Sequence, residues 1–288
     1  FYKQNSNESD FSPNNKKYCH EIALRIYYPT KDNKDLGSKF YEPYINDTNK
    51  WLAKTYNLYQ KEIEKLQSAT QIKTYTHQNA KPVSNKKFPL IIFMPGAGTP
   101  TQAYTNIISN LVSNGYIVMG VNSIFINGAI QLADGHVVVP QAYSDVDGRR
   151  ENISDLKFVL NNIQIIKFNY SLEKNIDWNR IELIGHSRGA MSIVNLLKNA
   201  TDTKNIKALI LLDPADKLGP ANYPLPDLKI PTLTIWGLQL KLDWHGSSTP
   251  AKNNIVVTLK PKDAADDYSG HNNFMDSSTL QYHPAYQI

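Results

Sequence analysis

Short apolar runs alternate with segments of helical periodicity along most of the chain. The runs that we expect to form β-strands are residues 22–28, 88–94, 116–121, 180–184, 208–212, 231–236 and 255–259. Between them, apolar residues recur at helical spacing over residues 101–114 and 149–168, and again from residue 190. Short strands that alternate with helices predict an α/β fold whose mostly parallel sheet is covered by helices on both faces.

The domain organisation predicted from this pattern is simple. We see no internal repeat or dividing linker, so we expect one domain over residues 22–288, preceded by a polar N-terminal arm over residues 1–21. Residues 49–67 predict an inserted helix, and residues 122–147, which have no strong period, form a possible lid. Apolar side chains there could face an acyl chain or a membrane, or only pack on the body: Trp51, Tyr56, Phe125, Ile126, Ile130 and Leu132.

Composition and charge exclude several classes of protein. The chain has 288 residues, of which 41% are hydrophobic and 20% charged, as in ordinary globular proteins. The net charge of +5 comes from scattered lysines, which does not indicate a nucleic-acid-binding protein. No apolar run is long enough to span a membrane. Cys19 is the single cysteine, and we expect it to be structural.

The first residue, Phe1, is not methionine, which predicts a processed or trimmed chain. A removed signal peptide is one explanation and an artificial boundary is another. We therefore expect a secreted or periplasmic protein, with the cytoplasm as the alternative.

The strongest chemical signal is Gly185-His186-Ser187-Arg188-Gly189, a G-x-S-x-G sequence between a predicted strand and a predicted helix. A nucleophilic serine needs a sharp strand-to-helix turn that raises its hydroxyl above the sheet, and the two glycines leave room for that turn. The sequence therefore predicts that Ser187 is the nucleophile of a serine hydrolase with an α/β-hydrolase fold, rather than part of a plain tight turn.

A glycine-rich segment follows the strand at residues 88–94. In this fold, such a segment and the residue after the nucleophile direct backbone N–H groups at the oxyanion that forms during acyl transfer. Pro95-Gly96-Ala97-Gly98 occupies that place, so we expect the N–H groups of Ala97 and Arg188 to form the oxyanion hole.

A serine nucleophile also needs a base and an acid that orients it, in the order Ser, Asp or Glu, His. His271 follows the last predicted strand and is the expected base, whereas His245 precedes that strand and His283 lies near the terminus. Many enzymes of this fold carry the acid after the next-to-last strand, where this chain has Gln239. Asp213 directly follows the preceding strand and is our first candidate, with Asp243 and Asp216 as alternatives.

Together these residues resemble the branch of serine esterases that includes platelet-activating factor acetylhydrolase and chlorophyllase. Gly185-His186-Ser187-Arg188-Gly189 is similar to the chlorophyllase elbow, although Ala190 follows where that family usually has glycine. The similarity extends to Asp213-Pro214, to Gly270-His271-Asn272-Asn273-Phe274, and to the early strand Arg25-Ile26-Tyr27-Tyr28-Pro29-Thr30. Pro95 departs from the His-Gly-x-Gly of that family, but a backbone oxyanion donor tolerates the change.

The resemblance implies a carboxylic ester hydrolase that acts through an acyl-enzyme, and we expect lipid or phospholipid acyl esters as substrates. The partners expected are a small-molecule or lipid ester and, transiently, a membrane surface. The alternatives are a peptidase of the same fold and a binding protein that keeps the fold without catalysis. We expect no cofactor and no metal, since the sequence contains no H-E-x-x-H motif and no paired Cys/His cluster.

Overall fold

The structure of the protein is a computed structural model. The described residues are 2–3, 20–31, 76–124, 126–128, 130–132, 137–138, 145–198, 200, 203–214, 228–237, 253–259, 271 and 274–276. The predicted inserted helix at residues 49–67 lies outside them.

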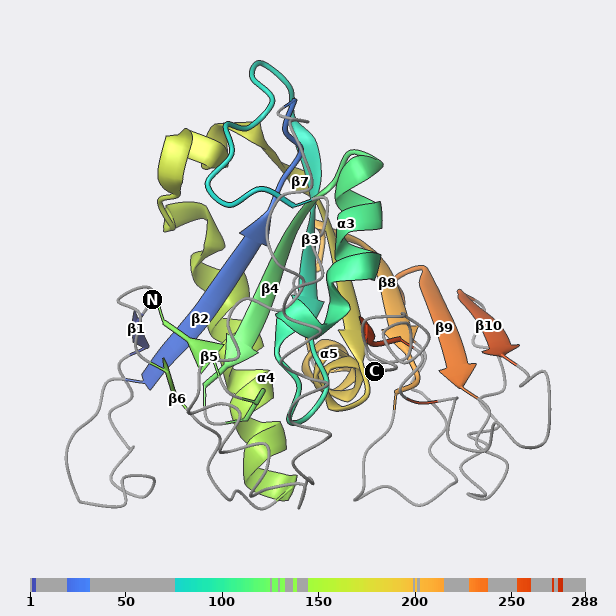
Figure 1. Cartoon of the computed structure of the whole chain (residues 1–288). Helices are drawn as coiled ribbons and strands as arrows, with labels where there is room; N and C mark the ends of the chain where they lie inside the picture. The colour runs from blue at the N-terminus through green and yellow to red at the C-terminus, as the bar shows by residue number, and fades with distance from the viewer. Residues whose placement is uncertain are drawn as a thin grey trace, which may run out of the picture.

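Within these residues an eight-stranded sheet forms the centre of the molecule, in the order β1-β2-β4-β3-β7-β8-β9-β10 (Figure 1). β2 is antiparallel to β1 and to β4, whereas all other neighbours are parallel. The strands are β1 Tyr2–Lys3, β2 His20–Tyr27, β3 Phe88–Met94, β4 Ile117–Ser123, β7 Ile176–His186, β8 Ile206–Leu212, β9 Thr232–Gly237 and β10 Asn254–Leu259. A separate pair consists of β5 Ile130–Gln131 and β6 Val137–Val138.

Helices cover both faces of this sheet (Figure 1). On one face lie the 3₁₀ helix η2 (Thr101–Tyr104) and the helix α3 (Thr105–Ser113). On the other face lie α4 (Asp145–Asn162) and α5 (Arg188–Lys198). Two further 3₁₀ helices, η3 (Ile163–Ile165) and η4 (Asn169–Asn175), connect α4 to β7. Among the helices that the structure describes, none is long and apolar enough to cross a membrane.

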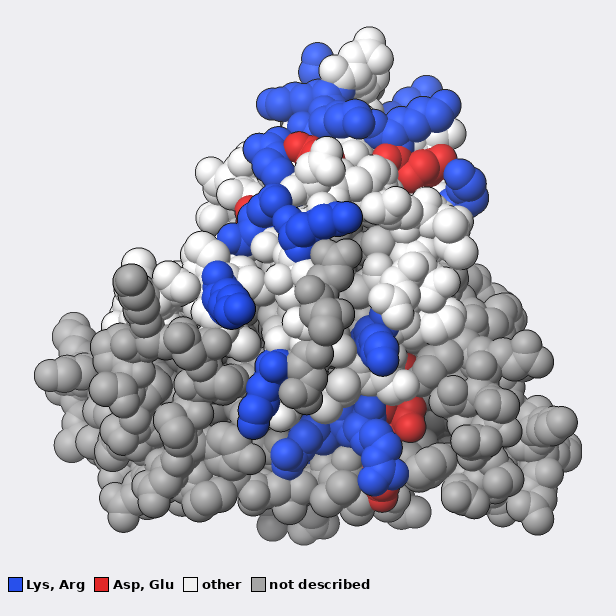
Figure 2. Space-filling view, turned by 180° about the vertical axis from the view of Figure 1, so that it is seen from behind, with Lys and Arg blue, Asp and Glu red and all other residues white. Residues whose placement is uncertain are grey.

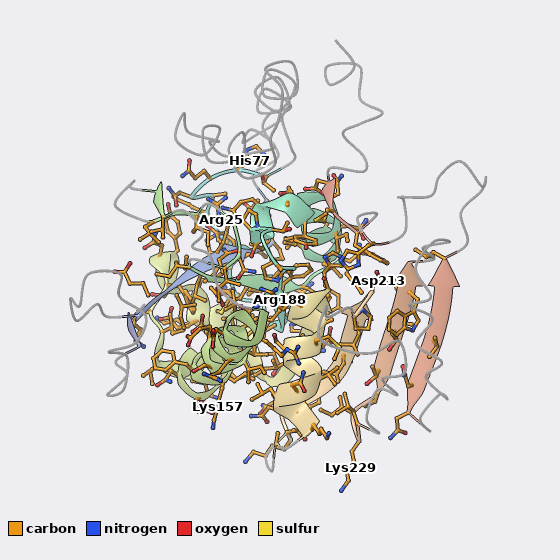
Figure 3. All side chains as sticks on the ribbon, turned by 90° about the horizontal axis from the view of Figure 1, so that it is seen from below. Arg25, His77, Lys157, Arg188, Asp213 and Lys229 are labelled. Atoms are coloured by element: carbon orange, nitrogen blue, oxygen red, sulfur yellow. The ribbon has the colours of Figure 1, made fainter. Side chains whose placement is uncertain are left out.

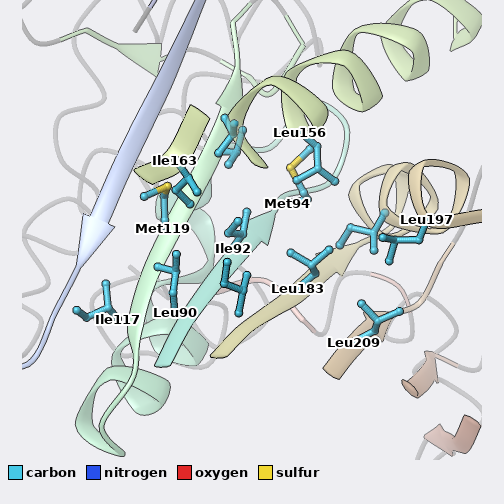
Figure 4. Close-up of a cluster of buried hydrophobic side chains, with 14 of the residues drawn as sticks. Leu90, Ile92, Met94, Ile117, Met119, Leu156, Ile163, Leu183, Leu197 and Leu209 are labelled. Atoms are coloured by element: carbon cyan, nitrogen blue, oxygen red, sulfur yellow. The ribbon is translucent and has the colours of Figure 1, made fainter. Parts of the chain in front are cut away.

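Alternate side chains of β3 explain why the sheet has a core on each face. Leu90, Ile92 and Met94 point to the side of α4 and α5, where they pack with residues such as Leu156 and Leu197 (Figure 4). The side chains of Ile91 and Phe93 point to the opposite side and pack against η2 and α3. A strand buried on both faces appears in the sequence as a continuous apolar run, which is how β3 was predicted.

The predicted α/β class with a mostly parallel sheet is confirmed, and several boundaries differ. The predicted helix over residues 149–168 is α4 with bounds Asp145–Asn162, followed by 3₁₀ turns. At its end the Asn162 side chain donates to the carbonyl of Phe158 (2.8 Å), an interaction typical of a helix terminus. β7 begins before the predicted strand 180–184. Its first part was missed because the polar Asp177 and Asn179 alternate with Ile176 and Trp178 and leave no continuous apolar run.

The described part of residues 122–147 packs on the body of the protein. Asn122 and Ser123 belong to β4, and the Ile126 and Ile130 side chains are buried. These two isoleucines therefore contribute to the protein interior. Phe125 lies outside the described residues, and whether the segment moves as a lid stays a prediction.

Lysine and arginine side chains gather at one end of the molecule, at the top of Figure 2. The exposed Lys86 and Lys87 immediately precede β3, and the exposed Lys174 lies just before β7. This end carries the beginnings of the parallel strands. These three lysines therefore lie at the end opposite the carboxyl ends of the strands, where the predicted site residues lie, whereas a smaller group of lysine and arginine side chains lies at the lower end in Figure 2.

Candidate active site

Ser187 lies on the turn between β7 and α5. Its backbone has a φ of +52°, a left-handed conformation that non-glycine residues rarely adopt. Two hydrogen bonds hold this strained residue: its N–H donates to the carbonyl of Leu212 in β8 (3.0 Å), and its carbonyl accepts from Met191 in α5 (3.1 Å). A serine held in this way at the end of a central strand has the geometry expected of a nucleophile elbow.

The two glycines of the motif allow α5 to begin directly against the sheet. A Cβ atom on Gly189 would lie 2.2 Å from the carbonyl oxygen of Met94 and 2.5 Å from that of Pro95. A Cβ atom on Gly185 would lie 2.6 Å from the backbone N and Cα of Ala190. All of these neighbours are backbone atoms, which cannot move aside independently. Glycine is therefore required on both sides of the serine.

Asp213 lies immediately after β8 and is nearly completely buried. Its φ of +39° is again left-handed, and its N–H donates to the carbonyl of Ile235 (2.7 Å). One carboxylate oxygen, Oδ1, accepts a hydrogen bond from the N–H of Gly237 at the end of β9 (3.0 Å). The alternative acids Asp216 and Asp243 lie outside the described residues, as does Gln239.

His271 lies between Ser187 and Asp213. Its Nε2 is 2.9 Å from Oγ of Ser187, and its Nδ1 is hydrogen-bonded to Oδ2 of Asp213. With a neutral imidazole, Nδ1–H donates to the carboxylate and Nε2 accepts from the serine hydroxyl. The structure thus brings together the three residues that the sequence predicted as acid, base and nucleophile. The rival histidines, His245 and His283, lie outside the described residues.

The loop of Ala97 lies beside the serine and is fixed by its neighbours. The Gly96 carbonyl accepts from the buried Asn127 side chain (2.9 Å), and the Gly98 N–H donates to the carbonyl of Ile126 (2.9 Å). A Cβ atom on Gly96 would lie 3.4 Å from Cβ of Ser187. Ala97 itself is exposed, and within the described residues its N–H has no hydrogen-bond acceptor.

Arg188, the second predicted oxyanion donor, is the first residue of α5. The first N–H groups of a helix have no acceptor within the helix, and the helix dipole adds positive potential there. The Arg188 guanidinium extends to α4, where a Cβ on Gly148 would lie 2.8 Å from it. Figure 3 looks onto this end of the molecule, with Arg188 and Asp213 near the middle and Lys157 and Lys229 toward the rim.

The segment that carries His271 is anchored by Asp276. Its two carboxylate oxygens accept hydrogen bonds from the first N–H groups of α3, those of Thr105 (2.6 Å) and Asn106 (3.0 Å). This carboxylate serves as the N-terminal cap of a helix distant in sequence. Burial raises the pKa of Asp276 to about 7, and this effect exceeds the opposing effect of the two hydrogen bonds.

Sequence reasoning missed two polar side chains that contact this site, His186 and Tyr104, as well as the anchor Asp276. His186 directly precedes the serine in the motif, and Tyr104 lies in η2. The only sequence signal for His186 was its place in G-x-S-x-G, where x can be any residue. Tyr104 was expected only as an apolar position of a helix. Its hydroxyl has a partner 82 residues away, and no local pattern predicts such a contact.

The described part of the chain contains no cluster of three or more His, Cys, Asp or Glu side chains that could hold a metal ion. The described residues give this site a hydroxyl, an imidazole, a carboxylate and backbone N–H groups. This set can perform nucleophilic acyl transfer without an additional group.

Comparison with known proteins confirms the predicted resemblance and the fold. Residues 12–123 match the family "platelet-activating factor acetylhydrolase, isoform II", a match that includes the Ala97 loop and ends before Ser187. A ferulic acid esterase from Streptomyces cinnamoneus has a similar structure, with a TM-score of 0.64, 18% sequence identity, and coverage of 91% of this chain and 71% of the esterase. No curated protein matches the sequence. The chain has an α/β-hydrolase fold.

Proposed function

We propose that this protein is a serine esterase that cleaves carboxylic esters through a Ser187-His271-Asp213 triad and an acyl-enzyme. The observation that carries the proposal is the continuous contact from Asp213 Oδ2 through both nitrogens of His271 to Oγ of Ser187. These residues come from three different parts of the chain and meet at the carboxyl ends of parallel strands, where α/β proteins place their active sites.

In the first half of the reaction, Nε2 of His271 takes the proton of the Ser187 hydroxyl as Oγ attacks the ester carbonyl. The backbone N–H groups of Ala97 and Arg188 donate to the oxyanion that forms. His271 then gives its proton to the departing alcohol oxygen, the ester C–O bond breaks, and the acyl group remains on Ser187.

In the second half, His271 takes a proton from water, which attacks the acyl-enzyme carbonyl. The tetrahedral intermediate collapses, Ser187 recovers its proton from His271, and the carboxylic acid leaves. Asp213 accepts the Nδ1–H of His271 throughout, which keeps the imidazole oriented and stabilises its charged form. Burial of Asp213 and its hydrogen bond from Gly237 support this role, because they fix the direction of the carboxylate.

For the substrate, we propose lipid or phospholipid acyl esters, met during transient contact with a membrane surface. The name of the matching family, which describes a hydrolase of platelet-activating factor, supports a phospholipid with a short acyl group. The name of the structural neighbour, ferulic acid esterase, favours a second candidate, an aromatic acid ester. Both candidates undergo the same acyl transfer and differ only in the group that the site must hold.

A substrate panel tests this proposal. It contains p-nitrophenyl esters of rising acyl length, methyl ferulate, a peptide anilide, and a phospholipid with an acetyl group at its second glycerol carbon, tested free and in vesicles. We expect turnover of the short esters and of the acetylated phospholipid, and none of the anilide. Cleavage of the anilide in preference to all esters would instead identify a peptidase.

Labelling with a fluorophosphonate separates catalysis from mere binding. An activated serine forms a covalent adduct with this reagent, so peptide mass analysis should find the adduct on Ser187. A folded protein that neither takes up the label nor cleaves any ester is a binding protein that has kept the fold, and this result overturns the proposal.

A further inference from the structure

Two buried side chains that the mechanism does not use connect the Ala97 loop to the His271 segment. The Gly96 N–H lies 3.0 Å from the hydroxyl of Tyr104, and this hydroxyl lies 2.7 Å from Nδ1 of His186. On the other side of the ring, Nε2 of His186 lies 2.9 Å from the carbonyl oxygen of His271. One chain of hydrogen bonds therefore joins the oxyanion loop to the backbone of the base.

The donors and acceptors of this chain allow one arrangement of protons for a neutral ring. A carbonyl oxygen only accepts, so Nε2 of His186 must carry the hydrogen that goes to His271. Nδ1 is then an acceptor, and the Tyr104 hydroxyl donates to it. The hydroxyl oxygen in turn accepts the hydrogen of the Gly96 N–H. Each polar group is thus satisfied in one direction along the chain.

Burial keeps solvent from competing for these hydrogen bonds. The exposed fraction is 0% for Tyr104 and 2% for His186. Desolvation, with a smaller contribution from nearby His271, lowers the pKa of His186 to about 4. The ring is therefore neutral at neutral pH, as the acceptor role of Nδ1 requires. An unsatisfied polar group in such surroundings costs more than the hydrogen bond itself contributes.

Contacts with neighbouring rings also hold the Tyr104 and His186 side chains in place. The Tyr104 ring lies 4.9 Å from that of Phe93 and 5.6 Å from that of His186, measured between centroids. The His186 ring in turn lies 4.7 Å from the His271 imidazole and 5.7 Å from Phe274. His186 therefore contacts the base in two ways, by its hydrogen bond to the backbone carbonyl of His271 and by the packing of its ring against the His271 imidazole.

We propose that Tyr104 and His186 are positioning residues that hold the Ala97 loop and the His271 backbone in place around Ser187. The inference rests on the proposed esterase function, since it assigns these residues to the geometry of that reaction. Ser187 follows His186 directly at the end of β7. From His186 the chain of hydrogen bonds extends to the Ala97 loop on one side and to the backbone of His271 on the other. A base displaced by about 1 Å can lose a hundredfold in rate, so such a fixed frame matters for catalysis.

Three variants separate the links of this chain. His186→Phe keeps a ring of similar size and removes both hydrogen bonds, and Tyr104→Phe removes a single oxygen atom. His186→Gln places an amide donor near the former position of Nε2. The matched control is Tyr28→Phe, because the hydroxyl of this half-buried tyrosine donates to the carbonyl of Ala80 (2.6 Å), away from the site.

The kinetic readout is kcat and KM for p-nitrophenyl acetate. We expect His186→Phe and Tyr104→Phe to lower kcat by about 10- to 100-fold while KM changes by less than about threefold, because only the alignment of the reacting groups is lost. His186→Gln should recover part of the kcat lost in His186→Phe, and Tyr28→Phe should match the wild type. The double variant, with both His186→Phe and Tyr104→Phe, should have about the kcat of the less active single variant, because both substitutions interrupt the same chain of hydrogen bonds.

A spectroscopic readout that needs no turnover completes the test. The Nδ1–H of a histidine bonded to a carboxylate gives a proton NMR signal far downfield, which His271→Ala identifies by its loss. We expect the signal to shift or broaden in His186→Phe and Tyr104→Phe and to stay in place in Tyr28→Phe. If His186→Phe does not fold, Tyr104→Phe decides.

The two proposals fail differently. A wild-type protein that cleaves no ester and takes no fluorophosphonate overturns the proposed function, and the NMR signal alone then decides the positioning role. An active wild type whose Tyr104→Phe and His186→Phe variants keep both kcat, within about twofold, and an unmoved signal overturns the positioning role alone.

Discussion

The Gly237 N–H donates to Oδ1 of Asp213 across a distance of 3.0 Å. Gly237 is the last residue of β9, and Asp213 follows β8, so this hydrogen bond joins the ends of two neighbouring strands. The other oxygen of the same carboxylate faces His271. With both oxygens engaged, the carboxylate cannot rotate, which makes the end of β8 a suitable place for an orienting acid.

Asp213→Asn should abolish most of the activity. The amide carries no charge to stabilise the imidazolium and no longer fixes the correct tautomer of His271, so we expect kcat to fall by about 10⁴-fold with little change in KM. Steady-state kinetics with a p-nitrophenyl ester measures this. The control is Asp177→Asn, which removes a partly exposed carboxylate that pairs with Arg180. A kcat for Asp213→Asn within about tenfold of the wild type would assign the acid to another residue.

Gly189 and Gly148, in the first turns of α5 and α4, should respond oppositely to alanine. In Gly189→Ala the new Cβ meets carbonyl oxygens of Met94 and Pro95 at 2.2 and 2.5 Å, and we expect a loss of at least about 3 kcal/mol of unfolding free energy. In Gly148→Ala the Cβ meets the flexible end of Arg188 at 2.8 Å, and helix propensity favours alanine by about 1 kcal/mol. Urea unfolding compares the two, and equal stabilities would contradict the backbone contact at Gly189.

Much of the fold could be predicted because the spacing of apolar residues indicates which segments form buried strands and helices. The run at residues 88–94 coincides with β3, since a strand buried on both faces is apolar throughout. The limits of α4 and β7 could not be predicted equally well. α4 begins within a segment of weak periodicity, and in the first part of β7 polar residues such as Asp177 and Asn179 interrupt the apolar run.

The candidate site divides in the same way. Ser187, Asp213 and His271 each follow a strand that was predicted from its apolar run. In the structure, His271 contacts both Ser187 and Asp213. Their catalytic roles stay predictions. Tyr104, His186 and Asp276 act through contacts between distant parts of the chain, and a tyrosine or aspartate within such segments has no pattern that reveals its partner.

Asp276 should make the stability of the protein depend on pH. Burial raises its pKa from 3.8 to about 7, so between these values the folded state keeps a proton that the unfolded state has released. The stability from this group is therefore present below pH 3.8 and is lost as the pH rises through about 7. The slope is at most about 1.4 kcal/mol per pH unit.

Asp276→Asn cannot ionise and supplies the comparison. We expect the unfolding free energy of the wild type, relative to that of the variant, to fall as the pH is raised from about 5 to about 8. Urea unfolding at each pH measures this difference. A difference that stays constant, or that rises with pH, would contradict the raised pKa.

The kcat of Ser187→Ala tests most directly whether Ser187 is the nucleophile. Alanine removes Oγ and leaves the elbow, the base and the acid in place, so we expect kcat to fall by about 10⁴- to 10⁶-fold with the unfolding free energy nearly unchanged. Ser113→Ala, at an exposed serine in α3, should keep wild-type turnover. Wild-type turnover by a folded Ser187→Ala protein would contradict the account.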